Sequence, residues 1–286
     1  MLFRSTHQLG NSKMDSFESL DKEIERHMDM IVSLRKRRNS LCPISRLPAE
    51  ILFMIFRSLQ VVNPENSFCS DRKWIAVTHV CSAWRTVALN CPILWSRISS
   101  FKQEAMVEAF LERSKESPLD VRLDVRENGI SEAKNLERVL LCLARIRVLE
   151  IVGIGLVGRS NGILNVIKDA LAKPAPILKE FTYSMPTQVQ YASFLSATLF
   201  DNQAPRLEHF HVRRGRFTWN PNILGGLTSL CLADILLEDI PDPLTLLRIL
   251  DHCPNLENLE LVGLELLNER AESISMQNCQ IGRAHV

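Results

Sequence analysis

Three closely spaced glycines carry the clearest pattern of enzymatic chemistry in the sequence. Gly153, Gly155 and Gly158 match G-x-G-x-x-G and follow the apolar segment 145–152, which predicts a strand. In dinucleotide-binding folds, glycines at this spacing let a pyrophosphate approach the start of a helix. The sequence therefore leaves open an NAD-binding oxidoreductase that uses these glycines.

Three details weigh against a dinucleotide site at Gly153–Gly158. Asn161-Gly162 is typical of a turn, at a point where the helix of such a fold should already be running. The next predicted strand carries Glu180 in its interior and no acidic residue placed to bind a ribose. The glycines also coincide with one copy of an apolar repeat. A structural role is therefore favoured, because a lone glycine pattern is a weak signal.

The histidines offer little metal-binding or catalytic chemistry. His209 and His211 alternate along one predicted strand after Glu208, so the two imidazoles share a face. No third ligand follows at a spacing that a zinc site needs, so polar surface residues are the favoured interpretation. H-E-x-x-H and P-loop motifs do not occur in the sequence. We expect no catalytic residue, metal site or cofactor, and predict that the chain is not an enzyme.

A group of basic residues stands beside aromatic ones: Arg213, Arg214, Arg216, Phe217 and Trp219. Such a patch could contact nucleic acid or an acidic peptide. The formal net charge of the chain is only +1, so no overall field attracts a polyanion. A solvated loop is the favoured interpretation, and we do not expect nucleic acid among the partners.

The composition is that of a water-soluble protein of one or two domains. The chain has 286 residues, of which 46% are hydrophobic and 23% charged, enough to form a substantial core. Its eight cysteines are scattered without a C-x-x-C pair, which indicates reduced thiols. The sequence lacks a signal peptide and any apolar run of about 18 residues. We expect a cytoplasmic and/or nuclear protein without a membrane partner.

The N-terminal segment predicts one amphipathic helix. Residues 1–14 are polar and expected to be disordered, whereas residues 15–42 carry apolar side chains at steps of three or four. This stripe consists of Phe17, Leu20, Ile24, Met28, Ile31 and Leu34. Acidic residues precede the basic cluster 35–38, as the helix dipole favours. Coiled-coil pairing of this helix is an open possibility.

Two further helices are predicted before a short strand. Pro48 and Glu50 favour a helix start, so the apolar run 51–56 is interpreted as helical. That helix is apolar nearly all round and needs neighbours on two sides. After a polar loop, residues 74–90 predict a second helix, which Cys91-Pro92 ends.

The rest of the chain repeats an apolar triplet at positions i, i+3 and i+5, after a predicted helix at 106–117 and strand at 119–125. The copies are Ile146/Leu149/Ile151, Leu178/Phe181/Tyr183, Leu207/Phe210/Val212, Leu227/Leu230/Leu232 and Leu256/Leu259/Leu261. Helix-like segments separate several of them. Because each such strand must bury one face against a stacked neighbour, the pattern predicts an irregular, leucine-rich-repeat-like α/β solenoid.

The segment 44–98 resembles the F-box, especially that of the large fungal (basidiomycete-type) F-box families. The residues that carry the resemblance, in order, are Leu47-Pro48, Glu50, the apolar run through Phe56, Val80-Cys81, Trp84-Arg85, Cys91-Pro92 and Leu94-Trp95. The polar loop 60–73 is longer than in a compact F-box. The resemblance implies a small all-α domain and, for the whole chain, an F-box protein.

The resemblance also implies a function. F-box proteins bind a Skp-type adaptor, and through it a cullin-RING ubiquitin ligase of the SCF type, while their C-terminal repeats hold an unknown protein substrate. Carried over by position, the adaptor-binding candidates are Leu47, Pro48, Ile51, Leu52, Ile55, Val80 and Trp84. Each could equally belong to the ordinary helix core. A leucine-rich-repeat scaffold that works outside any ligase is the main alternative.

Taken together, the sequence predicts an α+β chain in five parts. They are a disordered segment 1–14, the helix 15–42, an F-box 44–98, a leucine-rich-repeat-like domain 99–267 and a tail 268–286. The last six residues, 281–286, match a translated sequencing adaptor, so we expect them to be artefactual and the solenoid to be truncated.

Overall fold

The computed structural model describes residues 6–60, 70–99, 103–124, 130–153, 161–184, 193–194, 198–235, 242–267 and 273–282. The chain divides into two compact units. The first comprises residues 1–61 and 72–90, and the second comprises residues 62–71 and 91–286. The described part of the first unit is helical, whereas the second unit combines helices with a large sheet.

The first unit contains three α-helices and two 3-10 helices within its described residues. They are α1 (Thr6–Ser40), η1 (Pro43–Arg46), α2 (Ala49–Ser58), η2 (Ser70–His79) and α3 (Ser82–Leu89). Helix α1 covers residues 15–40 of the predicted helix 15–42 and also starts earlier, at Thr6, inside the segment 1–14 that was predicted to be disordered. Its last turn carries Arg37 and Arg38, where basic side chains interact favourably with the helix dipole.

Helix α2 begins as its sequence predicts. Pro48 occupies the N-cap position, and its carbonyl oxygen accepts hydrogen bonds from the backbone N–H groups of Ile51 and Leu52 at 3.1 Å. Glu50 lies in the first turn, where a carboxylate is favoured. The apolar run 51–56 is therefore helical, as predicted.

The prediction of one helix over residues 74–90 is wrong. The segment forms η2 and α3, and the chain between them is extended at Cys81 (φ −157°, ψ 169°). Thr78 donates its hydroxyl hydrogen to the carbonyl of Ile75 at 2.7 Å, and the Arg85 side chain donates to the carbonyl of Thr78 at 2.7 Å. These side-chain hydrogen bonds satisfy groups that a continuous helix would pair, so they compete with it.

The second unit is built on one eight-stranded sheet. Its order is β1 (Arg97–Ser99), β2 (Leu119–Asp124), β3 (Ile146–Val152), β4 (Glu180–Ser184), β6 (His209–Arg213), β8 (Ser229–Ala233), β9 (Asn258–Leu267) and β10 (Ser273–Gly282). All neighbours from β1 to β9 are parallel, and β10 pairs antiparallel with β9. A short pair of β5 (Ser193–Phe194) and β7 (Gly215–Arg216) lies apart.

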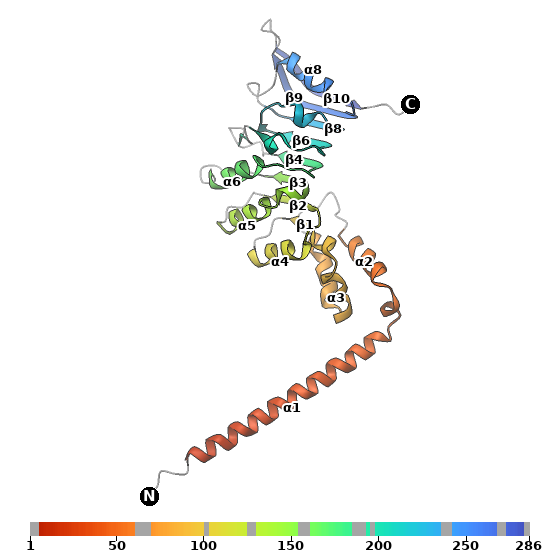
Figure 1. Ribbon diagram of the computed structural model, residues 1–286, viewed down its shortest axis with the longest axis vertical. Helices are drawn as coiled ribbons and strands as arrows, with labels where there is room; N and C mark the ends of the chain where they lie inside the picture. The colour runs from red at the N-terminus through yellow and green to blue at the C-terminus, as the bar shows by residue number, and fades with distance from the viewer. Residues whose placement is uncertain are drawn as a thin grey trace. The chain divides into compact units, whose positions relative to one another are not determined.

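Helices connect most of the parallel strands. They are η3 (Pro92–Trp95), α4 (Glu104–Ser114), α5 (Ile130–Leu140), η4 (Leu143–Arg145), α6 (Asn161–Leu171), η5 (Leu199–Asn202), α7 (Pro221–Leu224) and α8 (Pro243–Asp251). Strands β1 to β4 lie side by side in chain order, with α4, α5 and α6 stacked along one side (Figure 1). The predicted helices at 106–117 and between the repeats therefore correspond to α4, α6 and α8.

The predicted triplets align across the sheet. Their middle residues are register partners from strand to strand: Leu149, Phe181, Phe210, Leu230 and Leu259. Their last residues form a second such row: Ile151, Tyr183, Val212, Leu232 and Leu261. Both rows are buried. Each copy of the pattern thus supplies the inward face of one parallel strand, and adjacent copies bury one another.

Aromatic side chains fill the centre of this core. The ring of Phe181 lies 5.2 Å from that of Phe200 and 5.6 Å from that of Phe210. Phe210 in turn contacts Phe217, whose ring centroid is 5.2 Å away. Such tilted and edge-on pairs stabilise a core beyond the burial of their area. Phe217, predicted to lie in a solvated loop, is instead part of the core.

Candidate partner-binding surfaces

Helix α2 has two apolar faces of opposite burial. Leu52 and Phe56, one helical turn apart, are buried, at 5% and 0% exposure. Ile51 and Ile55 are 41% and 37% exposed, and Met54 is 63% exposed. One row of apolar side chains thus anchors the helix to its own unit, while the other row faces outward.

The buried face of α2 contacts α3. The ring of Phe56 lies 5.2 Å from the ring of Trp84, at a tilted angle, and these two side chains join the helices. Trp84 is half-buried, whereas Val80, in the extended connection before α3, is exposed. Its contact with Phe56 accounts for the partial burial of the Trp84 side chain.

The seven predicted contact residues therefore separate into three groups by burial. Pro48, Ile51, Ile55 and Val80 are exposed, Leu47 and Trp84 are half-buried, and Leu52 is buried. The exposed ones can contact a partner directly, whereas Leu52 can only support them through the core.

Three further apolar residues of this region are exposed and were not among the candidates: Ile44, Met54 and Leu59. Met54 and Leu59 fall on the same helical face as Ile51 and Ile55, at steps of three to five residues. The sequence shows this spacing, but the spacing does not predict which of the two apolar faces of α2 is buried. We call Ile51, Met54, Ile55 and Leu59, which share one face of α2, the apolar helical surface.

The apolar helical surface offers burial rather than chemistry. Its members are aliphatic or thioether side chains, which have no group that could act as an acid, base or nucleophile. Removing such a side chain from water contributes roughly 1.5–3 kcal/mol when it becomes fully buried. Clustered exposed apolar residues of this kind mark protein-interaction sites.

The outward face of the sheet in the second unit is polar. Its central row, in register from β2 to β9, is Arg122, Glu150, Thr182, His211, Cys231 and Glu260. We call these residues the polar row. Arg122 and Glu150 form an ion pair with a nitrogen–oxygen distance of 2.6 Å. Beside this row, the terminal nitrogen of Arg147 donates two hydrogen bonds to the carboxylate of Asp120, both 2.8 Å long.

The neighbours of the polar row change its titration. Burial, together with the carboxylate of Glu260, raises the pKa of the Cys231 thiol to about 12. The Cys231 sulfur lies 3.5 Å from a carboxylate oxygen of Glu260 and donates a hydrogen bond to it. Desolvation lowers the pKa of His211. Cys231 therefore stays a thiol and His211 is biased towards the neutral imidazole at neutral pH, so this face lacks the thiolate that cysteine chemistry needs.

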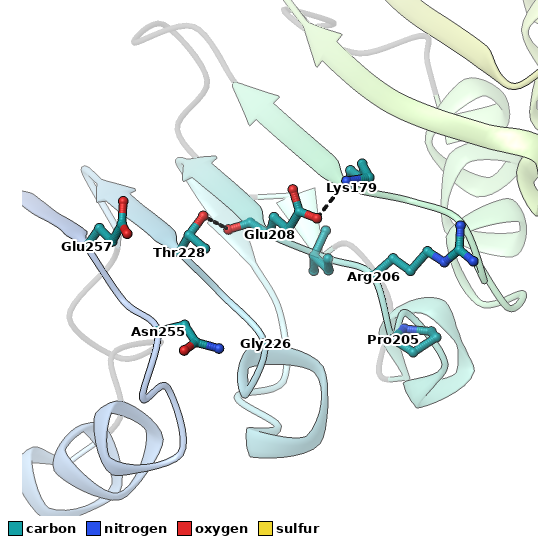
Figure 2. Close-up of a pocket in the computed structure, with 9 residues that line it drawn as sticks. Lys179, Pro205, Arg206, Glu208, Gly226, Thr228, Asn255 and Glu257 are labelled. Carbon is teal, nitrogen blue, oxygen red and sulfur yellow. Dashed lines mark hydrogen bonds and ion pairs between the residues drawn. The ribbon is translucent and has the colours of Figure 1, made fainter.

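A shallow pocket of about 740 Å³ lies where the strands begin (Figure 2). It is lined by Lys179, Pro205, Arg206, Leu207, Glu208, Gly226, Thr228, Asn255 and Glu257. The Lys179 amine donates a 2.7 Å hydrogen bond to the Glu208 carboxylate, which lowers the pKa of Glu208. Thr228 donates its hydroxyl hydrogen to the backbone carbonyl of Glu208 at 3.1 Å. Lys179, Glu208 and Thr228 of this pocket thus hydrogen-bond one another.

The glycine motif gains little support from the fold. Gly153 ends β3 with a positive φ of 80°, and its N–H donates to the carbonyl of Ser184, while Gly155 and Gly158 lie outside the described residues. The prediction of a turn at Asn161-Gly162 is wrong, because Asn161 starts α6 and Gly162 lies inside it. However, β1 to β9 follow chain order without the reversal at which doubly wound sheets bind dinucleotides.

The other chemical candidates are placed at the surface or in the core. His209 and His211 are exposed on β6, and no described group of three or more His, Cys, Asp or Glu side chains is arranged to hold a metal ion. Arg213 and Arg214 both pair with Asp234, at 3.0 and 3.5 Å. This neutralisation weakens the basic patch that a nucleic acid would need.

Comparison with known proteins identifies part of the chain. Residues 44–100 match the F-box-like family. The chain therefore carries an F-box-like domain, which spans α2, η2, α3, η3 and β1 and begins within η1. No curated protein and no solved structure matches the sequence. Within the described residues, no helix has the length and apolar character that crossing a membrane requires.

Proposed function

We propose that this chain, which carries an F-box-like domain at residues 44–100, is the substrate-receptor subunit of an SCF-type cullin-RING ubiquitin ligase. Its F-box-like domain binds a Skp-type adaptor, and its sheet unit holds the protein substrate. The chain itself performs no catalysis, because ubiquitin transfer belongs to the partner enzymes. Such a receptor works in the cytoplasm and/or nucleus.

The exposure of the apolar helical surface is the observation that supports adaptor binding. An isolated domain gains nothing from exposing Ile51, Met54 and Ile55 beside a helix face that is already buried. A permanent partner explains the arrangement, because it would remove these side chains from water. Residues 44–100 are also the part of the chain that matches the F-box-like family, whose domains generally bind such adaptors.

The second unit is proposed as a leucine-rich-repeat-like solenoid of the kind that follows the F-box in large fungal families. The aligned apolar rows of the parallel strands support this assignment. Its outward polar face, centred on the polar row, is the proposed substrate surface. Charged and hydrogen-bonding groups there favour specificity over strong affinity, which suits selection among substrates.

Co-purification of the full chain with a Skp-type adaptor tests the proposal. We expect a stable one-to-one complex for the native chain, and at least a hundredfold weaker binding for Ile51→Glu/Ile55→Glu. The change places two carboxylates in an interface that would bury them, which is costly. Circular dichroism and thermal unfolding check that the variant is folded.

A matched control changes exposed apolar residues elsewhere. Leu244 and Leu247 on α8 are 59% and 57% exposed, so Leu244→Glu/Leu247→Glu adds the same charge outside the F-box-like domain. This control should bind the adaptor like the native chain. Unchanged binding by Ile51→Glu/Ile55→Glu would refute the proposed contact surface.

Two alternatives have distinct signatures. A repeat scaffold that works outside any ligase predicts a folded chain that does not bind the adaptor at all. An NAD-binding oxidoreductase at Gly153–Gly158 predicts that NAD raises the unfolding temperature of the chain. The chain-order arrangement of the parallel strands favours a repeat protein over the second alternative.

A further inference from the structure

Helix α1 exposes an apolar stripe along its length. Every side chain from Ser16 to Arg38 is exposed, so the described structure buries none of this segment. Seven positions follow alternating steps of three and four residues: the apolar Phe17, Leu20, Ile24, Ile31 and Leu34, with His27 and Arg38 at the other two. We call these positions the α1 stripe. That spacing is the a/d pattern of a coiled-coil seam.

The α1 stripe needs a partner for a physical reason. Isolated helices are marginally stable in water, and most helical stability in proteins comes from packing of an apolar face. Here Phe17, Ile24 and Leu34 are 64%, 58% and 60% exposed. A helix of 35 residues with this seam gains stability when a second helix covers it.

The charges that flank the stripe identify the second helix. Asp21 and Glu23 border the stripe in its N-terminal half, and Arg35 and Arg37 border it at the corresponding positions in its C-terminal half. We propose that two copies of this chain associate through α1 as an antiparallel coiled coil centred near residue 29. In that arrangement Asp21 faces Arg35 of the second copy, and Glu23 faces Arg37 of the second copy.

The seam itself fits the same register. Ile24 packs against Leu34 of the second copy, Ile31 against His27, and Leu20 against the aliphatic stem of Arg38. Met28 and Met30 lie on the two flanks at the centre, where each meets its own counterpart. Methionine adapts well to such contacts because its side chain is flexible and polarizable.

A parallel pairing would lose these contacts. Arg38 would then face Arg38 of the second copy inside the seam, and the basic cluster 35–38 of one helix would lie against that of the other. Like charges in this position are destabilising, and the helix dipoles would also be aligned unfavourably. The segregation of acid and base along α1 therefore favours the antiparallel orientation.

The outer side of α1, opposite the α1 stripe, contains an ion pair within the helix. Lys22 forms an ion pair with Glu18 of the same helix, with a nitrogen–oxygen distance of 2.8 Å. No described residue forms an ion pair with Asp21, Arg35 or Arg37. Three of the four charges that the antiparallel register brings together thus lack an ionic partner within the described helix, whereas Glu23 lies 3.9 Å from the imidazole of His27.

Charge reversal of the full chain tests both the association and its orientation. Sedimentation velocity should show a concentration-dependent dimer for the native chain. Asp21→Arg/Glu23→Arg and, separately, Arg35→Glu/Arg37→Glu should each weaken the dimer about tenfold to a hundredfold, because each creates four like-charge contacts. Combining all four substitutions should restore the dimer, since complementary charges then face each other again.

The control changes the net charge by the same amount at two residues on the outer side of α1. Glu18→Arg/Glu25→Arg reverses two carboxylates away from the stripe and should leave the dimer intact. A native chain that stays monomeric at all concentrations overturns the proposal. So does a dimer that the quadruple variant fails to restore although the helix content of that variant, measured by circular dichroism, is native. Two copies joined in this way would present two sheet faces, so a substrate with two binding segments would gain affinity through effective concentration.

Discussion

The two units of this protein present opposite kinds of surface. The helical unit buries one apolar row of α2, at Leu52 and Phe56, and exposes another, at Ile51 and Ile55. The sheet unit buries every residue of its two inner rows from β3 to β9 and exposes charged and polar groups that pair with one another. An apolar surface requires a partner to be removed from water, whereas a paired polar face is stable in water by itself.

This difference supports the roles proposed for the two units. The apolar helical surface suits one constant partner, since burial is strong but does not discriminate between apolar partners. The polar row suits selection, because an unmatched charge or donor at such a face costs binding free energy.

The largest effect is expected in the core of the sheet. Phe181→Ala should lower the free energy of unfolding of the sheet unit by about 3–5 kcal/mol, because it removes a buried ring that contacts Phe200 and Phe210. Thr182→Ala, on the outward face of the same strand, should change it by less than about 0.5 kcal/mol. Chemical denaturation of the two variants measures the difference. Equal losses would mean that the two faces of the sheet are not distinguished as described.

The two faces of α2 should separate stability from binding. Leu52→Ala should lower the stability of the helical unit by about 2–5 kcal/mol, because its side chain is buried. Ile51→Ala, one residue earlier, should leave stability within about 0.5 kcal/mol of native and weaken adaptor binding instead. Thermal unfolding and a binding titration of both variants provide the test. A loss of stability from Ile51→Ala would contradict its assignment to the outer face.

Smaller effects are expected from the outward ion pairs of the sheet. Arg122→Ala should lower stability by about 0–1 kcal/mol, because its pair with Glu150 is partly exposed. The loss should shrink further at high salt, which screens exposed charges. Denaturation curves at low and high salt measure both effects. A loss of several kcal/mol would show that the polar face contributes to the fold as strongly as the core.

The smallest change concerns the reactivity of one thiol. With its pKa raised to about 12, Cys231 should be alkylated much more slowly at pH 8 than the exposed Cys42. Glu260→Gln should lower the pKa of Cys231, because it removes a negative charge that opposes the thiolate. The thiolate fraction and the alkylation rate at a given pH should therefore rise. Site-resolved mass spectrometry follows both cysteines, and an unchanged rate at Cys231 would contradict the assigned role of Glu260.

Part of the fold could be predicted because it depends on local pattern. The start of α2 follows from Pro48 and Glu50, and the apolar triplets identify the inward faces of five strands. The match over residues 44–100 agrees closely with the predicted segment 44–98. These features depend on the types of neighbouring residues, which the sequence shows directly.

Other features depended on contacts that no local pattern shows. The break between η2 and α3 arises from side-chain hydrogen bonds of Thr78 and Arg85, which compete with a helix that periodicity alone favours. Phe217 was assigned to a solvated loop but packs against Phe210 of β6. Asn161-Gly162 has turn propensity, yet both residues are helical, since tertiary context overrides a weak local preference.

The sequence by itself determined which residues are apolar and at what period, and this specified the helices α1 and α2 and the repeating strand unit. Only the tertiary structure decided which apolar face of α2 is buried, because Phe56 packs against Trp84 and becomes fully buried, while Ile51 and Ile55 stay 41% and 37% exposed. It also decided that Leu149, Phe181, Phe210, Leu230 and Leu259 share one row. Burial and register are properties of pairs of segments, so they are settled when the segments meet.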